Sequence, residues 1–235
     1  MCGRYVSPEQ AAIERAWHIG RAGSPFPRRF NVQPTSMVPI LRRSRTSGEL
    51  TLSEARWGLI PNWWKEDKPP RASFNARSEE AADKPMWRQP LRMSRCLLPA
   101  EGWYEWQEVE QVDPATGEVR KAKQPHFIRL PGGRLFCFAG LMSLWRPPGK
   151  DEPLLSCSIL TGQAAPQLAT IHQRMPLALP DDVHDEWLDP AMKDGAKALE
   201  LARARALSRF EHHPVSTRVN YANIDDPGLI EAVSA

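Results

Sequence analysis

The chain has 235 residues, which is enough for one large domain or two small ones with a sizeable core. Apolar residues make up 41% and charged residues 25%, which indicates a globular protein; the net charge of +3 allows a nucleic-acid partner without predicting one. A signal-peptide pattern and a long apolar run are both lacking, which excludes the secreted and membrane-spanning classes. We therefore expect a cytoplasmic protein, associated with the nucleoid if the source is bacterial.

The cysteines and prolines set further bounds. The four cysteines are far apart and form no C-x-x-C pair, so the sequence predicts neither a zinc site nor disulfides; they are Cys2, Cys96, Cys137 and Cys157. We expect no metal and no cofactor. The 23 prolines are spread over the whole length, and they disfavour long helices and favour short strands joined by fixed turns.

A helix is expected near the start of the chain. Ser7 is in the position of an N-cap, Pro8 is at the first helical position, and Gln10 is at the capping-box position. Ile13 and Trp17 then fall on one face of the predicted helix. The sequence predicts that this short helix packs through that face.

The remaining periodicity is mainly that of strands. The predicted strands are residues 38–41, 50–57, 96–99, 103–109, 127–130, 135–144, 154–160 and 212–219. Helical spacing returns at residues 163–171, 182–188 and 191–208, and residues 113–117 predict a turn. We expect a single compact α+β domain over residues 1–235, with a strand-rich, barrel-like and mainly antiparallel centre, short flanking helices and a less ordered tail from about residue 222.

Cys2 directly follows the initiator methionine. Removal of Met1 gives Cys2 a free α-amine beside its thiol, and in water these groups titrate near ~7.7–8.0 and ~8.5. Such a 1,2-aminothiol acts as an amine-assisted nucleophile, or it condenses with an aldehyde to an imine that the sulfur closes into a thiazolidine. Taken alone, residue 2 is explained more simply as a disordered terminus that carries a cysteine.

Two polar residues lie in segments that allow a chemical role. Asn75 belongs to the polar segment 74–79, where an asparagine is more often a turn-former. Glu105 stands between Tyr104 and Trp106 in a predicted strand. Its carboxylate is either on the solvent face or desolvated with a raised pKa, and the second case suits acid–base chemistry near neutral pH.

A histidine near a predicted helix end is the fourth candidate. His172 is followed by Arg174, and Pro176 stops the helix. A lone histidine in such a place is commonly structural. At the mouth of a site, however, its imidazole could relay protons while Arg174 holds a phosphate.

These segments together resemble the SOS-response-associated peptidase family, also called abasic-site processing proteins. The resemblance covers nearly the whole chain and is carried by an ordered set of motifs. They are Met1-Cys2-Gly3-Arg4, Trp57-Gly58-Leu59-Ile60-Pro61-x-Trp63, Asn75-Ala76-Arg77-Ser78-Glu79, Arg95-Cys96-Leu97-Leu98-Pro99 through Tyr104-Glu105-Trp106, Phe138-Ala139-Gly140-Leu141, Ile171-His172-x-Arg174-Met175-Pro176 and Val215-Ser216-Thr217-x-Val219-Asn220.

The resemblance implies a sensor of abasic sites in single-stranded DNA, including strands at a junction with duplex. It implies four active-site residues, Cys2, Asn75, Glu105 and His172. It further implies phosphate contacts from Arg4, Arg77 and Arg174, with Trp63 and Trp64 near the strand. We expect a monomer that acts without an obligate protein partner or a membrane. Ala164-Ala165 departs from the alanine–asparagine common in the family, which leaves a DNA contact at 163–165 open.

The expected reaction is a covalent crosslink. Glu105 would catalyse opening of the sugar hemiacetal, and the Cys2 amine would form a Schiff base that the thiol closes into a thiazolidine. His172 would stabilise or relay a proton at the sugar oxygen, while Asn75 would orient Cys2. Strand cleavage by β-elimination is an expected side activity, and any peptidase activity is expected to be self-directed, as in removal of Met1.

Three other functions fit part of the pattern. An N-terminal-nucleophile hydrolase, such as a glutamine amidotransferase domain, also begins Met-Cys-Gly, but its arginine–histidine–glycine–proline-like segment is lacking. A cysteine protease would use Cys2 and His172, yet no orienter of the histidine is evident. A non-catalytic reader of single-stranded or modified DNA would use tryptophans and arginines alone. A covalent adduct that survives boiling in detergent would exclude this function.

Overall fold

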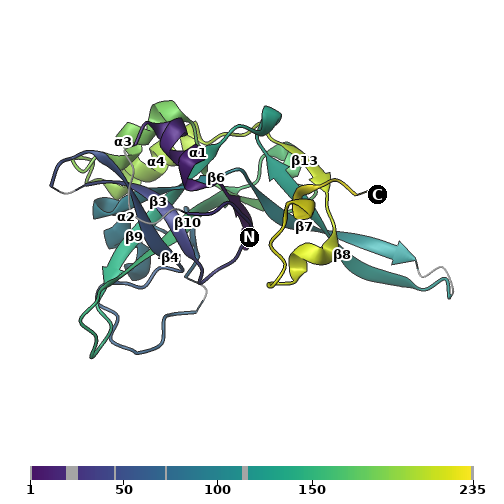
Figure 1. Cartoon of the computed structure of the whole chain (residues 1–235), viewed down its shortest axis with the longest axis horizontal. Coiled ribbons are helices and arrows are strands. Elements are labelled where there is room, and N and C mark those ends of the chain that lie inside the picture. Colours follow the sequence, from purple (N-terminus) through teal and green to yellow (C-terminus); the bar gives the residue numbers. More distant parts are fainter. Residues whose placement is uncertain (1, 20–25, 45, 72, 113–115, 234–235) are drawn as a thin grey trace.

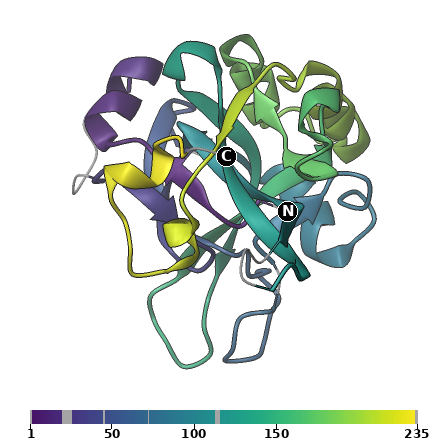
Figure 2. The ribbon, with the colours of Figure 1, turned by 90° about the vertical axis from the view of Figure 1, so that its right-hand side faces the viewer.

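Two β-sheets form the body of the protein, and short helices lie along its outside (Figure 1). The computed structural model describes residues 2–19, 26–44, 46–71, 73–112 and 116–233. In the view turned by 90°, strands occupy the centre, helices lie at the periphery, and the yellow C-terminal segment crosses in front of them (Figure 2).

The larger sheet closes on itself. Its ring consists of strands β3 (Met37–Arg43), β4 (Leu50–Trp57), β6 (Arg95–Ala100), β9 (Phe136–Trp145) and β10 (Leu154–Gln163). Strand β10 pairs with both β4 and β9, so the order β10-β4-β3-β6-β9 returns to its start. Such closure leaves the ring without open edges. The predicted barrel-like centre is confirmed, and its pairs are antiparallel except where β10 meets β4 and β5.

Three short strands extend this ring near the residues of interest. They are β5 (Asn75–Arg77), β11 (Arg174–Pro176) and β12 (Ala178–Leu179). Strand β5 pairs in parallel with β10, and β11 pairs with the end of β10 in antiparallel register. Asn75 and Arg174 are far apart in the sequence, but each lies on a strand that pairs with β10.

The smaller sheet is antiparallel and carries the N-terminus. Its order is β13 (Glu211–Pro214), β8 (Val119–Arg129), β7 (Gly102–Val112), β1 (Tyr5–Ser7) and β2 (Arg29–Val32). Strands β7 and β8 form a long hairpin that projects from the body (Figure 1). Gly102 permits a close crossing at its base, because an added Cβ would lie 2.5 Å from the carbonyl oxygen of Ile128.

The helices are α1 (Gln10–Trp17), α2 (Pro85–Met93), α3 (His184–Leu188) and α4 (Gly195–Arg205). Short 3-10 turns lie elsewhere along the chain, at Pro131–Gly133, Pro166–Leu168, Asp181–Val183, Thr217–Asn220 and Pro227–Ile230. Helix α4 begins where the Asp194 side chain accepts hydrogen bonds from two backbone amides. Among the described residues no helix has both the length and the apolar character needed to cross a membrane.

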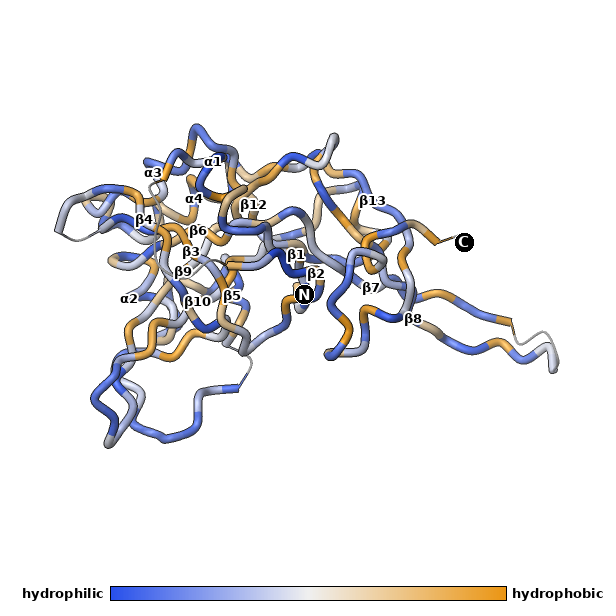
Figure 3. The backbone as a smooth tube through the Cα atoms, in the orientation of Figure 1, coloured by the Kyte–Doolittle hydropathy of each residue, from blue (hydrophilic) through white to orange (hydrophobic). Residues whose placement is uncertain are grey.

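Apolar side chains fill the space inside and around the strands. The tube coloured by hydropathy shows orange segments within the strands, while the loop after residue 60 is mostly hydrophilic (Figure 3). The largest fully buried side chains include Trp57, Trp103 and Trp187. Many of the tryptophans therefore stabilise the core rather than binding a partner.

Most predicted strands are confirmed, with β4 matching residues 50–57, but several local predictions were wrong. Ser7 is not an N-cap, because residues 5–7 pair in the sheet and α1 begins at Gln10 without a side-chain cap. The helix predicted at 163–171 is the end of β10 followed by a 3-10 turn, and the strand predicted at 212–219 ends at Pro214. The helix predicted over 191–208 is shorter, and α2 was not predicted. The turn at 113–117 lies partly outside the described residues.

The C-terminal segment differs from the less ordered tail expected from about residue 222. Leu229 is fully buried, and Ala232 bridges Val215 in antiparallel register. The Asp225 carboxylate accepts hydrogen bonds from the amides of Phe30 and Asn31. Up to residue 233, the segment therefore packs against the N-terminal half of the smaller sheet.

Candidate active site

Cys2 lies buried between the two sheets at the beginning of the chain. The amide nitrogen Nδ2 of Asn75 donates a hydrogen bond of 2.8 Å to the Cys2 carbonyl oxygen. On the other side, the backbone N–H of Tyr104 donates to the carbonyl of Arg4 at 3.0 Å, which continues the pairing of β1 with β7. Contacts from β5 and β7 thus fix the backbone around the thiol, contrary to a disordered terminus.

Glu105 is on β7 beside this backbone, and its side chain is only 3% exposed. Burial raises the pKa of Glu105 to about 7. Both protonation states are therefore populated at neutral pH. Burial, together with the negative charge of Glu105, also raises the pKa of the Cys2 thiol well above its ordinary value, so that the sulfur remains protonated until a reaction step removes the proton.

His172 and Glu105 line the same narrow gap, which has no room for a water molecule. Arg174 and Met175 line the same gap, and burial lowers the pKa of His172, so its imidazole is neutral at pH 7. The ring atom Nδ1 lies 3.0 Å from both the backbone nitrogen and the backbone oxygen of Arg174, which fixes its orientation. No orienting group for His172 was evident in the sequence; in the structure the backbone of Arg174 orients it.

The four chemical candidates therefore converge. Asn75 contacts the Cys2 backbone, Glu105 acts electrostatically on the Cys2 thiol, and Glu105 and His172 line the same narrow gap. The Oδ1 atom of Asn75 is buried and has no hydrogen-bond partner among the residues that the structure describes. An acceptor of this kind is suited to orient an amine or a hydroxyl group.

Two arginines line an open cavity of about 630 Å³ next to this centre, and both are paired with glutamates. Arg174 donates to the two carboxylate oxygens of Glu79 at 3.2 and 2.9 Å, and it also donates to the carbonyl of Thr161. The Arg77 guanidinium, which is 54% exposed, lies 3.8 Å from Glu80. A bidentate carboxylate has the hydrogen-bonding geometry of a phosphate, so Arg174 presents a geometry that also fits a phosphate.

Arg4 is partly buried and is held by neighbouring segments. Its guanidinium donates to Oδ1 of Asn31 at 2.8 Å and to the carbonyl of Asn220 at 3.3 Å. Asn31 is buried and donates through Nδ2 to carbonyls of the C-terminal segment at Val219 and Ile224. We call this group the Arg4–Asn31 network.

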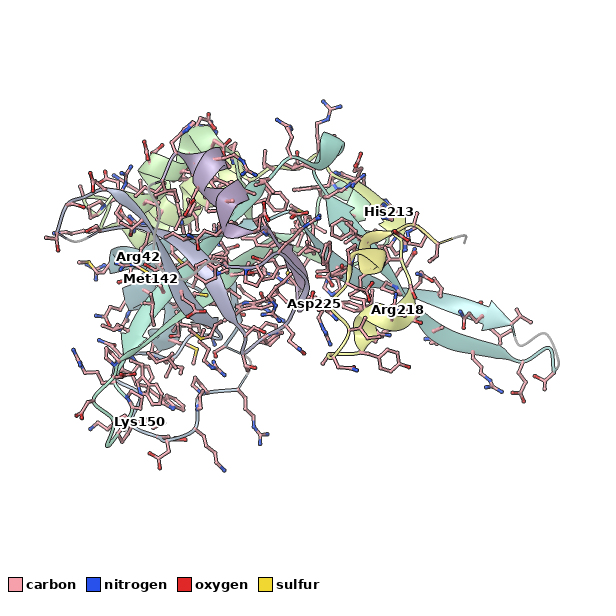
Figure 4. The ribbon with its side chains drawn as sticks, viewed as in Figure 1. Arg42, Met142, Lys150, His213, Arg218 and Asp225 are labelled. Atoms are coloured by element: carbon pink, nitrogen blue, oxygen red, sulfur yellow. The ribbon has the colours of Figure 1, made fainter. Side chains whose placement is uncertain are left out.

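The Arg4–Asn31 network was not predicted from the sequence. The only local signal is a polar residue between Phe30 and Val32 in an apolar segment. The C-terminal segment that closes the network carries Arg218 and Asp225 and passes over β7 and β8 (Figure 4). Because it contacts Arg4, it helps to hold the chain two residues from Cys2.

Trp63 and Trp64 lie apart from the buried centre, on the loop that follows β4. Their rings are 6.0 Å apart between centroids, and Trp63 is 49% exposed. Nε1 of Trp145 donates to the carbonyl of Trp64 at 2.8 Å, and Nε1 of Trp64 donates to the carbonyl of Lys68. One indole is therefore anchored, and the other presents a surface on which a base could stack.

The site combines a buried cysteine at position 2 with a carboxylate of near-neutral pKa, a neutral imidazole and adjacent arginines. Among the described residues, no group of histidine, cysteine, aspartate or glutamate side chains is arranged to hold a metal ion. The described cysteines are free and buried.

Comparison with known proteins defines the family. The sequence model of the SOS response associated peptidase (SRAP) family matches residues 1–222, and the chain belongs to this family. It is 35% identical over 203 residues to the abasic site processing protein YoqW of Bacillus subtilis, covering 86% of this chain and 85% of the relative. It is 34% identical to the abasic site processing protein HMCES of Gallus gallus, over 84% of this chain and 64% of that protein.

The fold comparison agrees with this assignment. A phage-related protein of Bordetella bronchiseptica, known from its crystal structure, superposes with a TM-score of 0.66 at 29% identity, over 91% of this chain and 94% of that chain.

Proposed function

We propose that this protein captures abasic sites in single-stranded DNA by forming a covalent crosslink through Cys2. The observation that carries the proposal is the buried Cys2, held by Asn75 and placed beside a glutamate whose pKa is about 7. The names of the relatives as abasic site processing proteins point to the same substrate. A crosslink of this kind would protect the lesion during the response to DNA damage.

The reaction begins with Cys2 as the first residue, after Met1 has been removed. An abasic deoxyribose is mostly a closed hemiacetal, so protonated Glu105 assists its opening to the aldehyde. The α-amine of Cys2 attacks C1′, and the resulting carbinolamine loses water, with the proton for the leaving hydroxyl coming from Glu105. The thiol then adds to the imine carbon and gives its proton to the carboxylate. The net change is loss of one water.

The other two residues assist these steps. His172 is neutral, so it can hydrogen-bond the sugar oxygen without adding a fixed positive charge to the site. Asn75 holds the Cys2 carbonyl through Nδ2, which leaves its Oδ1 to orient the amine. The imine also acidifies the C2′ proton, and β-elimination from this intermediate gives the lyase side activity. Self-directed removal of Met1 by the same centre accounts for the peptidase name.

Strand binding is assigned to the surface next to the centre. A phosphate replaces Glu79 on Arg174, where the carboxylate already makes a bidentate contact, and another replaces the weaker contact of Glu80 with the half-exposed Arg77. Bases stack on Trp63, which supports a strand without requiring a particular sequence. Such binding weakens as the salt concentration rises.

A denaturing gel with an oligonucleotide that carries one abasic site tests the proposal. Wild type should form a shifted band that survives boiling in detergent, Cys2→Ala should form none, and Glu105→Gln should react more slowly. A variant that keeps residues upstream of Cys2 should also fail, because its amine is tied up as an amide. Crosslinking by that blocked variant at the normal rate would overturn the proposed chemistry.

A further inference from the structure

A second depression adjoins the arginine-lined cavity, and we call it the side pocket. Its volume is about 620 Å³, and it lies between β10, β11 and the end of α4. Glu79, Gln163 and Ala164 line both the side pocket and the cavity that contains Arg77 and Arg174. A strand held by these arginines therefore has a neighbouring depression within immediate reach.

The side pocket has apolar walls and a polar rim. Met175 and Leu177 are each 4% exposed and contribute apolar surface, which Leu207 extends. Gln163 and Ser208 contribute an amide and a hydroxyl group at the exposed rim. An apolar surface with polar donors and acceptors at its edge suits a planar heteroaromatic ring with hydrogen-bonding groups on its periphery.

Arg203 gives the pocket a fixed cationic wall. Its Nε donates to the Ser78 hydroxyl at 3.2 Å, and Nη2 donates to the Ser78 carbonyl. Because these bonds hold the guanidinium in place, its plane and remaining N–H groups are available to a base without a large loss of side-chain entropy. An isolated anion is a poorer match, since the Glu79 carboxylate lies in the same lining.

We propose that the side pocket binds a nucleobase of a nucleotide that flanks the abasic site. The inference rests on the proposed function, and it extends that function from the lesion to its neighbour. The lesion itself has no base to fill a pocket, whereas the adjoining nucleotides do. Phosphates on Arg77 and Arg174 would bring one of these bases over the apolar surface of Met175 and Leu177.

The test measures binding of the Cys2→Ala variant, which cannot crosslink, to fluorescent oligonucleotides with one stable abasic analogue. Each flanking nucleotide is replaced in turn by a second baseless spacer. Removal of one particular flanking base should weaken binding by roughly 5- to 100-fold, the range expected for one stacked base. Losses below twofold at every flanking position would overturn the inference.

A matched pair of substitutions locates the effect. Ala206 lines the side pocket, whereas Ala204 is exposed on α4 and is outside its lining. Ala206→Trp should fill the pocket and abolish the dependence on the flanking base, while Ala204→Trp should retain it. Retention of the dependence by a folded Ala206→Trp variant would place the base elsewhere and contradict the proposal. If Ala206→Trp does not fold, the scan is repeated with Trp63→Ala. Retention of the dependence on one base supports the side pocket, and its loss would place the base on Trp63 and contradict the proposal.

A parallel crosslinking reaction with the otherwise wild-type protein separates this inference from the proposed function. A Cys2-dependent crosslink without any effect of flanking bases would sink only the side-pocket assignment. Dependence of binding on one base, without a crosslink, would support the pocket and sink the covalent mechanism.

Discussion

The buried centre and the arginine-lined surface are built in opposite ways. Around Cys2, each neighbour is fixed by the sheets, and Glu105 is only 3% exposed. Around the arginine-lined cavity, Arg77 is 54% and Arg174 20% exposed, and both are balanced by adjacent glutamates. Burial therefore shifts the pKa values that govern the reaction, whereas exposure leaves the arginines free to exchange one anion for another. Substitutions in the two regions should thus separate chemistry from affinity.

The largest expected effect comes from replacing only the sulfur. Cys2→Ser keeps the α-amine and can still form an imine, but it cannot close a thiazolidine. We expect no boiling-resistant adduct under ordinary conditions and an adduct that appears when borohydride reduces the imine. The readout is a denaturing gel with and without borohydride. A stable unreduced adduct of Cys2→Ser would show that sulfur is not needed for ring closure.

Glu105→Gln should slow crosslinking by about 10²- to 10⁴-fold, because it removes a general acid–base group. The wild-type rate should fall as the pH rises above about 7, because Glu105 loses the proton it donates. The rate of the variant should not show this fall. Single-turnover rates from pH 5 to 9 measure both. An unchanged rate and pH profile in the variant would remove Glu105 from the mechanism.

Although Glu105→Gln should slow the reaction, it should raise the free energy of unfolding at high pH. Because the folded-state pKa of Glu105, about 7, exceeds the unfolded value of ~4.3, the neutral carboxyl group stabilises the fold at low pH. That contribution is lost as the pH rises from ~4.3 through 7. At pH 8, Glu105→Gln should therefore be more stable than wild type, by about 3–4 kcal/mol. Urea unfolding at pH 5 and 8 checks this; a variant that is less stable at pH 8 would contradict it.

An intermediate effect is expected in the Arg4–Asn31 network. Asn31→Ala leaves the Arg4 guanidinium and buried carbonyls of the C-terminal segment without their partner, so we expect a loss of about 1–3 kcal/mol in unfolding free energy. Crosslinking should slow because the chain beside Cys2 is less well held. Asn220→Ala is the milder control, since it keeps the backbone carbonyl that Arg4 contacts and loses only the exposed hydrogen bond from Trp106 to the Asn220 side chain. Equal stability of wild type and Asn31→Ala would argue against the network.

The smallest effects on DNA binding are expected from substitutions in the ion pairs of Arg77 and Arg174 with their neighbouring glutamates. Glu79→Gln weakens the ion pair with Arg174, so DNA binding should strengthen by a few-fold at low salt, about 1 kcal/mol or less for a partly exposed pair. Arg77→Ala should weaken binding and reduce the slope of log affinity against log salt by about 1. Anisotropy titrations at several salt concentrations measure both. Weaker binding by Glu79→Gln would mean that the carboxylate positions Arg174 rather than competing for it.

Local patterns were sufficient for much of the barrel. Alternation and strand-forming residues predicted the segments of β3, β4, β6, β9 and β10. They could not predict that β10 pairs with both β4 and β9, because pairing partners depend on tertiary contacts. Ser7 failed as a helix cap for the same reason: its neighbours pair with β2, and this tertiary contact overrides the local helix signal.

The candidate site shows the same division. Family motifs indicated Cys2, Glu105 and His172. Whether the Glu105 side chain is buried or exposed could not be decided from its aromatic neighbours in the sequence. Asn31 was missed because its partners include Ile224, 193 residues away. The side pocket was also invisible in the sequence, since β10, β11 and α4 form it only after folding.

Mass spectrometry of the crosslinked protein tests the central claim most directly. After digestion of the DNA and cleavage by trypsin following Arg4, the sugar should be on the peptide Cys2–Arg4, with a mass one water below the sum of the two components and no thiol that iodoacetamide can alkylate. The sugar on another peptide, or on a peptide that still carries Met1, would contradict the account.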